Sequence, residues 1–386
     1  MKPDWTPGNR LQLLCTGSEY FPALEAAIRA ARVEFHLETY IYEDDDTGRR
    51  ITAALCDAAG RGVAVHVMVD GFGAKDMHDF LKRQLREAGV RLLVFRPKIS
   101  PLTLKRERLR RLHRKLVVAD ASVAFVGGIN IIDDMHTPGQ IPPRYDYAVR
   151  IEGPLVPAIH DSMLRLWNSV AWGHGSPGLI HRPDIAPDGT PRGTQRAALV
   201  VRDNFRHRSD IEDVYLAAID AARDEIIIAN AYFFPGRRFR QALVRAAARD
   251  VRVVLLLQGR VEYLLLHHAS RALYGTLLEA GVEIHEYHKS FLHAKVAVID
   301  GHWATVGSSN IDPFSLFLAR EANVVVDDRG FAAELRVSLH RAMEEGALHV
   351  AREHWFRQPL WKRLPIWISY GVVRFLMGVV GYAREL

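Results

Sequence analysis

The sequence contains very little cysteine: Cys15 and Cys56 are the two cysteines among 386 residues. Two separated thiols exclude a disulfide framework and a cysteine-rich metal cluster, and they favour a reducing compartment. The opening residues, MKPDWTPGNRLQLL, lack the basic-then-apolar layout of a secretory signal. The body of the sequence also lacks an apolar run long enough to span a bilayer. We therefore expect a folded protein that is neither secreted nor threaded through a membrane.

Acidic residues are fewer than basic ones: the sequence has 45 Asp and Glu against 51 Lys and Arg, which gives a net charge of +6. A basic balance favours an anionic partner, which could be nucleic acid or the phosphates of a membrane surface. Composition alone does not choose between these two. With 48% hydrophobic and 25% charged residues, the chain can fill the core of one large or two ordinary α/β domains.

One motif occurs twice. HRKLVVADASVAFVGGIN is followed, in the second half of the chain, by HAKVAVIDGHWATVGSSN, and His, Lys, Asp, Gly and Asn recur at identical distances. Two matches at five positions make a chance origin negligible. The repeated residues are His113, Lys115, Asp120, Gly127 and Asn130, and then His293, Lys295, Asp300, Gly307 and Asn310.

The similarity extends over both halves of the chain. EFHLETYIYEDD is echoed by EIIIANAYFFPG, GRGVAVHVMVDG by ARDVRVVLLLQG, and LREAGVRLLVF by LLEAGVEIHEY. Apolar β-branched runs that alternate with helix-like stretches predict an α/β sheet covered on both faces. The chain should form two similar α/β sandwich domains, related as a pseudo-dimer. The predicted boundaries are 1–172 and 197–350 for the domains, 173–196 for a Gly- and Pro-rich linker, and 351–386 for a tail.

Each motif predicts a β-hairpin, with turns centred between residues 121 and 122 and between 301 and 302. Asp120 and Asp300 fall at these turns, which favours a structural role for them. Small residues opposite each Lys would leave space for a ligand, so that imidazole, ammonium and amide form a phosphate cradle. The predicted pairs are His113 with Asn130, Lys115 with Gly128, His293 with Asn310, and Lys295 with Ser308.

Two histidines suit the exchange of phosphodiesters. One imidazole attacks phosphorus, and the other protonates the departing alcohol and then deprotonates the incoming one. Lys and Asn side chains would hold the nonbridging oxygens, and we expect neither a metal nor a cofactor. A zinc site from His285, His288 and His293 is rejected, because the first two lie on opposite faces of a strand. The alternative is a repeat that persists only as a scaffold.

The pattern H-x-K-x₄-D-x₆-G-[GS]-x-N is the HKD motif of the phospholipase D superfamily, and two copies in one chain resemble its lipid-acting members. FHLETYIYEDDDTG, RYDYAVRIEGP, HHASRALYGTLLEAGVEIHEY and LHAKVAVIDGHWATVGSSNIDPFSL resemble bacterial cardiolipin synthases of the B type. The resemblance implies one active site between the two domains. It also implies that Asp146 in RYDYAV and Glu321 in AREANVVV orient the catalytic histidines, although either could be an ordinary surface carboxylate.

The resemblance implies a reaction that needs no nucleotide donor. One phosphatidylglycerol would give its phosphatidyl group to His113 and release glycerol, with His293 as acid and base, and a second phosphatidylglycerol would then form cardiolipin. A hydrolytic phospholipase D, in which water is the acceptor, remains an alternative. The apolar tail argues against the second alternative, a nuclease, and the intact duplicated residues argue against a third, a catalytically silent binding module.

The tail contains the one strongly apolar stretch, PLWKRLPIWISYGVVRFLMGVVGYAREL. Arg374 at its centre argues against a span, whereas flanking Trp, Lys and Arg suit a helix that lies on the headgroups. The alternative is a terminal helix packed on the body or on a partner subunit. We expect a peripheral protein on the cytoplasmic side of the bacterial inner membrane, with phosphatidylglycerol rather than nucleic acid as partner. The sequence does not determine the oligomeric state.

A basic insertion, RPKISPLTLKRERLRRLHRK, precedes the first motif and has no counterpart of equal length before the second. It carries a single acidic residue, Glu107, and would attract anionic headgroups by about 1 kcal/mol per Lys or Arg. The alternatives are a solvated charged loop or a nucleic-acid patch.

Overall fold

A computed structural model of the chain describes residues 2–97, 110–135, 137, 141–203, 206–261, 264–312, 319–357 and 359–379. Most of the basic insertion, residues 98–109, and the end of the tail, residues 380–386, therefore lie outside the described residues.

Two runs of elements follow the same order. Each run alternates strands with helices, continues with an antiparallel hairpin and ends with a long helix. The first run contains β1 (Thr6–Cys15), α1 (Thr16–Ala30), β2 (Glu34–Thr39), α2 (Asp46–Gly60), β3 (Ala64–Asp70), α3 (Asp79–Glu87), β4 (Arg91–Phe95), β5 (Arg111–Leu112), β6 (Lys115–Ala119), β7 (Val123–Gly127), β8 (Arg144–Tyr145), β9 (Tyr147–Glu152) and α5 (Val156–Gly173). The second contains β10 (Gln195–Arg202), α6 (Asp210–Ala221), β11 (Glu225–Asn230), α7 (Arg237–Ala247), β12 (Arg252–Gln258), α8 (Leu264–Arg271), α9 (Tyr274–Glu279), β13 (Glu283–Tyr287), β14 (Phe291–Leu292), β15 (Lys295–Ile299), β16 (Trp303–Gly307), β17 (Ala319–Asp327) and α11 (Arg329–Gly346), followed by β18 (Ala347–His349), α12 (Arg352–Phe356) and α13 (Leu360–Val379).

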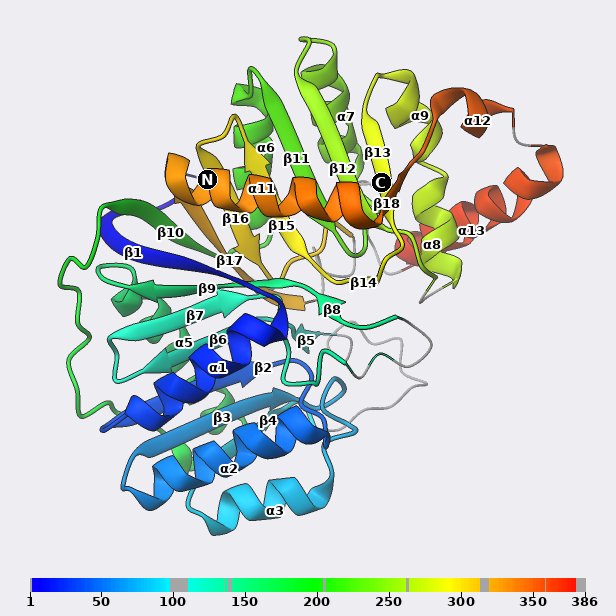
Figure 1. Ribbon diagram of the computed structural model, residues 1–386. Helices are drawn as coiled ribbons and strands as arrows, with labels where there is room; N and C mark the ends of the chain where they lie inside the picture. Colours follow the sequence, from blue (N-terminus) through cyan, green and yellow to red (C-terminus); the bar gives the residue numbers. More distant parts are fainter. Residues whose placement is uncertain are drawn as a thin grey trace.

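The strands form one continuous sheet that is nearly symmetric about its centre. Its order is β18-β13-β12-β11-β15-β16-β17-β10-β1-β9-β7-β6-β2-β3-β4, and the two halves join where β1 pairs with β10 in antiparallel fashion. Figure 1 shows the two halves stacked on either side of this junction, each with helices against its strands. The prediction of two similar α/β domains arranged as a pseudo-dimer is confirmed.

A shared apolar core holds the halves together. Leu116 and Val118 on β6 belong to the same buried cluster as Val296 and Val298 on β15, and Leu335 from α11 packs among them. Separate clusters lie beneath the outer helices of each half. Buried β-branched strands of this kind favour packing on both faces of a sheet. The junction between the halves is therefore part of the hydrophobic core.

The connection from α5 to β10 packs against the first half. The backbone N–H of Asp188 donates to the carbonyl of Ala121 over 2.9 Å, and His181 is buried. This segment falls within the predicted linker, residues 173–196. No helix of the described part of the chain combines the length and apolar character needed to cross a membrane.

The register predicted for the hairpins is wrong by one residue. Lys115 pairs with Gly127 rather than Gly128 on β7, and on the second hairpin Val296 pairs with Val306. The reason is that the loop has an odd number of residues: β6 ends at Ala119 and its last pair is with Val123. His113 therefore does not pair with Asn130, and by the same shift neither His293 with Asn310 nor Lys295 with Ser308.

Asp120 and Asp300 act at the turn end of their hairpins. The Asp120 carboxylate accepts hydrogen bonds of 2.8 to 3.0 Å from the backbone N–H groups of residues 32–34. Asp300 accepts three matching bonds of 2.9 to 3.1 Å from residues 223–225. Each carboxylate thus fixes the chain that enters the neighbouring strand, β2 or β11, which is the structural role favoured by the sequence.

We predict that Asp120→Ala destabilises the fold, because three backbone N–H groups lose their charged acceptor. The expected loss is about 2 kcal/mol in the free energy of unfolding, measured as a lower urea midpoint by circular dichroism. Asp57→Ala, at an exposed position of α2, is the matched control and should change stability by less than about 0.5 kcal/mol. Equal midpoints for the two variants would contradict the assigned role of Asp120.

Candidate active site

The backbone preceding each motif is hydrogen-bonded to the other half of the molecule. Strand β5 pairs in parallel with β17, and β8 pairs in parallel with β14. The N–H of His113 donates to the carbonyl of Arg320 over 3.0 Å, and the N–H of His293 donates to that of Tyr145 over 2.8 Å. This exchange brings the first residues of both motifs to the junction between the halves.

Each motif histidine contacts a carboxylate from the opposite half. His113 Nδ1 lies 3.0 Å from Glu321 Oε1 and 3.1 Å from Oε2, and His293 Nδ1 lies 2.6 Å from Asp146 Oδ2. Both carboxylates are almost fully buried. The sequence suggested these two carboxylates as partners of the histidines, and the structure pairs them crosswise.

Gly128 and Ser308 hold the carboxylates in place. A Cβ atom at Gly128 would overlap the Asp146 carboxylate, so only glycine fits beside it. At the matching position of the second motif, the Ser308 hydroxyl donates to Glu321 Oε2 over 2.5 Å. The space expected for a ligand beside these two small residues is therefore taken up by the carboxylates themselves.

The motif lysines lie buried beside the histidines. Lys115 Nζ donates to the His113 carbonyl over 2.5 Å, and Lys295 Nζ lies 2.8 Å from His293 Nδ1 and 3.4 Å from Asp146 Oδ2. Burial lowers the pKa of Lys115 to about 7, Glu321 opposes this change, and Lys295 adds to it. Because Glu321 contacts both His113 of the first motif and Ser308 of the second, the two motifs share a single site.

The histidines are held in the neutral form. Burial lowers the pKa of His113, and burial together with the Lys295 charge lowers that of His293 to about 3. Burial alone would raise the pKa of Asp146, but Lys295 and His293 hold it below its usual value. The ionised Asp146 therefore accepts the Nδ1–H of His293, which leaves a lone pair on Nε2.

Comparisons with known proteins agree with this geometry. Residues 24–154 and 215–343 match the family model described as cardiolipin synthase, PLD-like domain. The chain belongs to this family. It is 39% identical over 99% of its length to cardiolipin synthase B of Escherichia coli (strain K12), covering 92% of that protein. It is also 30% identical over 93% of its length to the major cardiolipin synthase of Bacillus subtilis (strain 168), covering 74% of that protein.

The fold of this family member also resembles a solved structure of low sequence identity. The crystal structure of a phosphatidylserine synthase from Haemophilus influenzae Rd KW20 superposes with a TM-score of 0.70 at 12% identity, covering 96% of this chain and 94% of that one. The similarity extends over both halves and so supports the pseudo-dimeric arrangement.

The two motif asparagines each carry a buried polar atom without a partner. Asn130 Oδ1 accepts from the N–H of Ile41 over 3.1 Å, but its Nδ2 has no hydrogen-bond partner among the described residues. Asn310 Oδ1 is equally unpartnered within that part of the chain. Buried polar atoms of this kind are rare and are a common feature of ligand sites.

Two further residues of the site were not identified from the sequence. The Tyr40 ring, at the end of β2, lies 4.7 Å from the His113 ring, and Lys115 Nζ lies 5.4 Å from its centre. Arg144, two residues before Asp146, helps to lower the pKa of His293 and Lys295. Arg144 lies in the segment RYDYAV quoted for Asp146, and Tyr40 lies in the repeated segment EFHLETYIYEDD, so both were in stretches that the sequence singled out without a role for either residue.

We predict that each carboxylate controls the tautomer of the histidine in the other half. Asp146→Asn replaces an acceptor with an amide that can donate, so His293 should move toward the Nε2–H tautomer while His113 keeps its own. Glu321→Gln should give the reverse pattern. NMR spectra of protein labelled with ¹⁵N-histidine report the tautomer of His113 and of His293 in each variant. The signals are assigned with His→Gln variants. A response confined to the histidine of the same half would contradict the crosswise pairing.

Proposed function

We propose that this protein is a cardiolipin synthase that transfers a phosphatidyl group between two phosphatidylglycerol molecules and releases glycerol. The observation that carries the proposal is the pair of crosswise histidine–carboxylate contacts with two buried lysines beside them. Membership of the PLD-like cardiolipin synthase family supports lipid phosphodiesters as the substrate class. The enzyme would be a phosphatidyltransferase that needs no nucleotide, since one phosphodiester replaces another.

In the first half-reaction, His113 Nε2 attacks phosphorus and the bond from phosphorus to the glycerol oxygen breaks. Glu321 keeps the proton on Nδ1, so the lone pair of Nε2 is free to attack. His293 donates a proton to the departing glycerol oxygen. Because His293 is neutral without substrate, its proton must be gained when the anionic phosphodiester binds and raises its pKa.

In the second half-reaction, His293 removes the proton from a hydroxyl of the second phosphatidylglycerol. That oxygen attacks phosphorus, the bond to His113 breaks, and cardiolipin is formed. Lys115, Lys295, Asn130 and Asn310 would bind the nonbridging oxygens and stabilise their charge in both transition states. Burial of these groups strengthens each contact, because water does not compete for the same oxygens.

We predict that purified protein converts labelled phosphatidylglycerol in mixed micelles into cardiolipin and glycerol. His113→Ala and His293→Ala should each lower the rate at least about 10³-fold, because each removes a group that acts in both half-reactions. His302→Ala, an exposed histidine at the second hairpin turn, is the matched control and should keep full activity.

Three outcomes would contradict this scheme. Phosphatidic acid as sole product would indicate a hydrolase, and nicked plasmid with intact lipid would indicate a nuclease. Substantial cardiolipin formation by either histidine variant would refute the two-histidine mechanism.

Label recovered on protein in His293→Ala but not in His113→Ala would identify His113 as the nucleophile, and the reverse result would exchange the two roles.

We further propose that α13 holds the enzyme at the membrane surface. Its inner face is buried against the body, as Ile366, Ser369 and Val373 show by their low exposure. The opposite face carries large apolar side chains that are 41% to 70% exposed and are spaced three or four residues apart. These residues are Trp361, Leu364, Ile368, Val372 and Phe375.

This outer face suits the boundary between headgroups and acyl chains. A contiguous exposed apolar row is unusual on a protein surface and favours burial in another phase. Trp367, on the same helix, and Leu264, on α8, are also more than half exposed, and α8 lies beside α13 (Figure 1). The two expectations for the tail are thus compatible, because one face packs on the body while the other remains available to lipid.

We predict that Trp361→Ser/Phe375→Ser weakens binding to phosphatidylglycerol vesicles at least about tenfold, because two large apolar side chains no longer enter the bilayer. Cosedimentation with vesicles measures the effect. Trp172→Ser removes a side chain that is 78% exposed on α5 and should leave binding unchanged. Equal binding by all three proteins would exclude α13 as the contact surface.

A further inference from the structure

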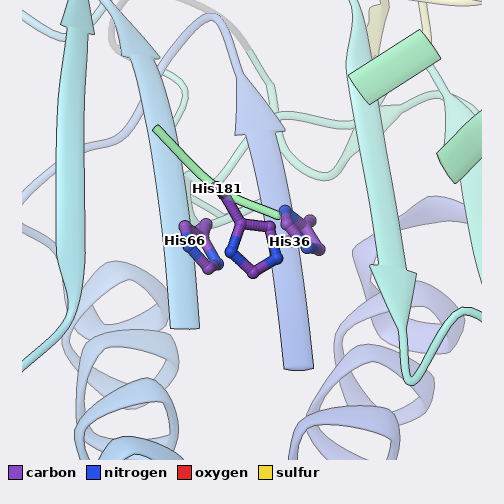
Figure 2. Close-up of side chains that lie close together, drawn as sticks. All are labelled: His36, His66 and His181. Atoms are coloured by element: carbon purple, nitrogen blue, oxygen red, sulfur yellow. The ribbon is translucent and has the colours of Figure 1, made fainter. Parts of the chain in front are cut away.

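Five ionisable side chains form a buried cluster in the first half, separate from the motif residues. Glu34 and His36 lie on β2, His66 on β3, His160 on α5 and His181 on the connection to β10. Each is at most 6% exposed. Figure 2 shows the rings of His36, His66 and His181 close together, and the ring centres lie 4.6 Å apart for His36 and His66, 5.2 Å for His36 and His181, and 4.1 Å for His66 and His181. Three distant parts of the chain therefore meet at these imidazoles.

The fold does not need histidine at these positions. His36 and His66 are paired neighbours on the parallel strands β2 and β3, and the repeat matches them with Ile227 and Val254, paired in the same way on β11 and β12. Both of those residues are fully buried in the apolar core. The first half thus has a polar cluster where the second half has ordinary core packing.

The cluster has more polar atoms than its own contacts satisfy. His36 Nε2 and His160 Nε2 lie 3.4 and 2.6 Å from the Glu34 carboxylate, but neither contact has the geometry of a hydrogen bond. Glu34 contacts three histidines, and no Lys or Arg of the described chain pairs with it. A buried carboxylate needs a compensating positive charge, which either a protonated imidazole or a bound metal ion can supply.

We propose that this cluster binds one divalent transition metal ion, with Zn²⁺ as the best match, through His36, His66 and His181 together with Glu34. Two overlapping sets of residues could supply the ligands, and within each set all ligand atoms lie within 4.8 Å of one another. The sets are His36, His66 and His181, and Glu34, His36 and His160. Three imidazoles and one carboxylate form a tetrahedral donor set that suits zinc, whose ligands stand about 3.4 Å apart. Small side-chain rotations would close the set around the ion.

The surroundings favour ligation by two of these residues, His66 and His181. His66 Nδ1 donates to the Ala64 carbonyl over 3.1 Å, which leaves the Nε2 lone pair for a ligand, although Arg91 Nη1 lies 3.1 Å from that atom and would have to move. The backbone of His181 is fixed by Asn168, which donates to its carbonyl over 2.9 Å and accepts from its N–H over 2.8 Å.

The proposed site is structural, because it lies away from the motif histidines. His36 pairs with Val118 on β6, five residues along the strand from His113, which corresponds to about 16 Å. A metal ion here would hold the connection to β10 against strands β2 and β3. It would therefore fix the beginning of the segment that connects the first half to the second.

Full-length, tag-free protein tests the proposal directly. After chelator dialysis, titration with ZnCl₂ should show one tightly bound equivalent, and CoCl₂ should give the visible absorption of a tetrahedral site. The double variant His36→Ile/His66→Val carries the residues found at the matching positions of the second half. It should no longer bind the equivalent of zinc. His285→Ala/His349→Ala removes a neighbouring pair of histidines of the second half and should retain it.

A third variant covers the case in which the double variant does not fold. His181→Gln changes a ligand outside the regular strands and should weaken zinc binding at least about 100-fold while Asn168 still holds the backbone. Zinc should also raise the melting temperature of the wild type more than that of either ligand variant. The proposal is overturned if the wild type binds no stoichiometric zinc, or if the ligand variants bind it as tightly as the wild type.

Discussion

The candidate site depends on the exchange of short strands between the two halves. β5 pairs with β17 and β8 with β14, so the residue that begins each motif is hydrogen-bonded to the other half. This pairing brings Glu321 to His113 and Asp146 to His293. Neither half alone contains a motif histidine together with the carboxylate that it contacts. The shared apolar core that joins the halves is therefore a condition for chemistry as well as for stability.

The same junction concentrates buried charge. Lys115, Lys295, Asp146 and Glu321 are all at most 4% exposed, and an unpaired charge at such depth would be strongly destabilising. Two ammonium groups and two carboxylates offset one another, with Arg144 adding positive charge. An anionic phosphodiester would complete this balance. Such an arrangement is typical of sites that function, because apolar residues would fill the same space at lower cost.

The two halves share a fold but differ in what surrounds it. Strands β2 and β3 present histidines toward α5 and the connecting segment, whereas β11 and β12 present isoleucine and valine at the matching positions. The second half instead carries α13, with its apolar outer face. Duplication thus preserved the core and the motifs, while one half acquired a polar cluster and the other an exposed apolar helix.

The sequence by itself determined the two α/β halves, the motif and the turn positions of Asp120 and Asp300, because strand periodicity and repeated spacing are local properties. It did not determine the hairpin register, because the repeated spacing does not show whether the loop between the two strands has an even or an odd number of residues. In the structure Ala119 pairs with Val123, so the loop is residues 120–122. The crosswise pairing of carboxylates and histidines, and the meeting of His36, His66 and His181, were decided only by the tertiary structure. Two similar halves carry equivalent local signals, so only their packing selects which carboxylate reaches which imidazole.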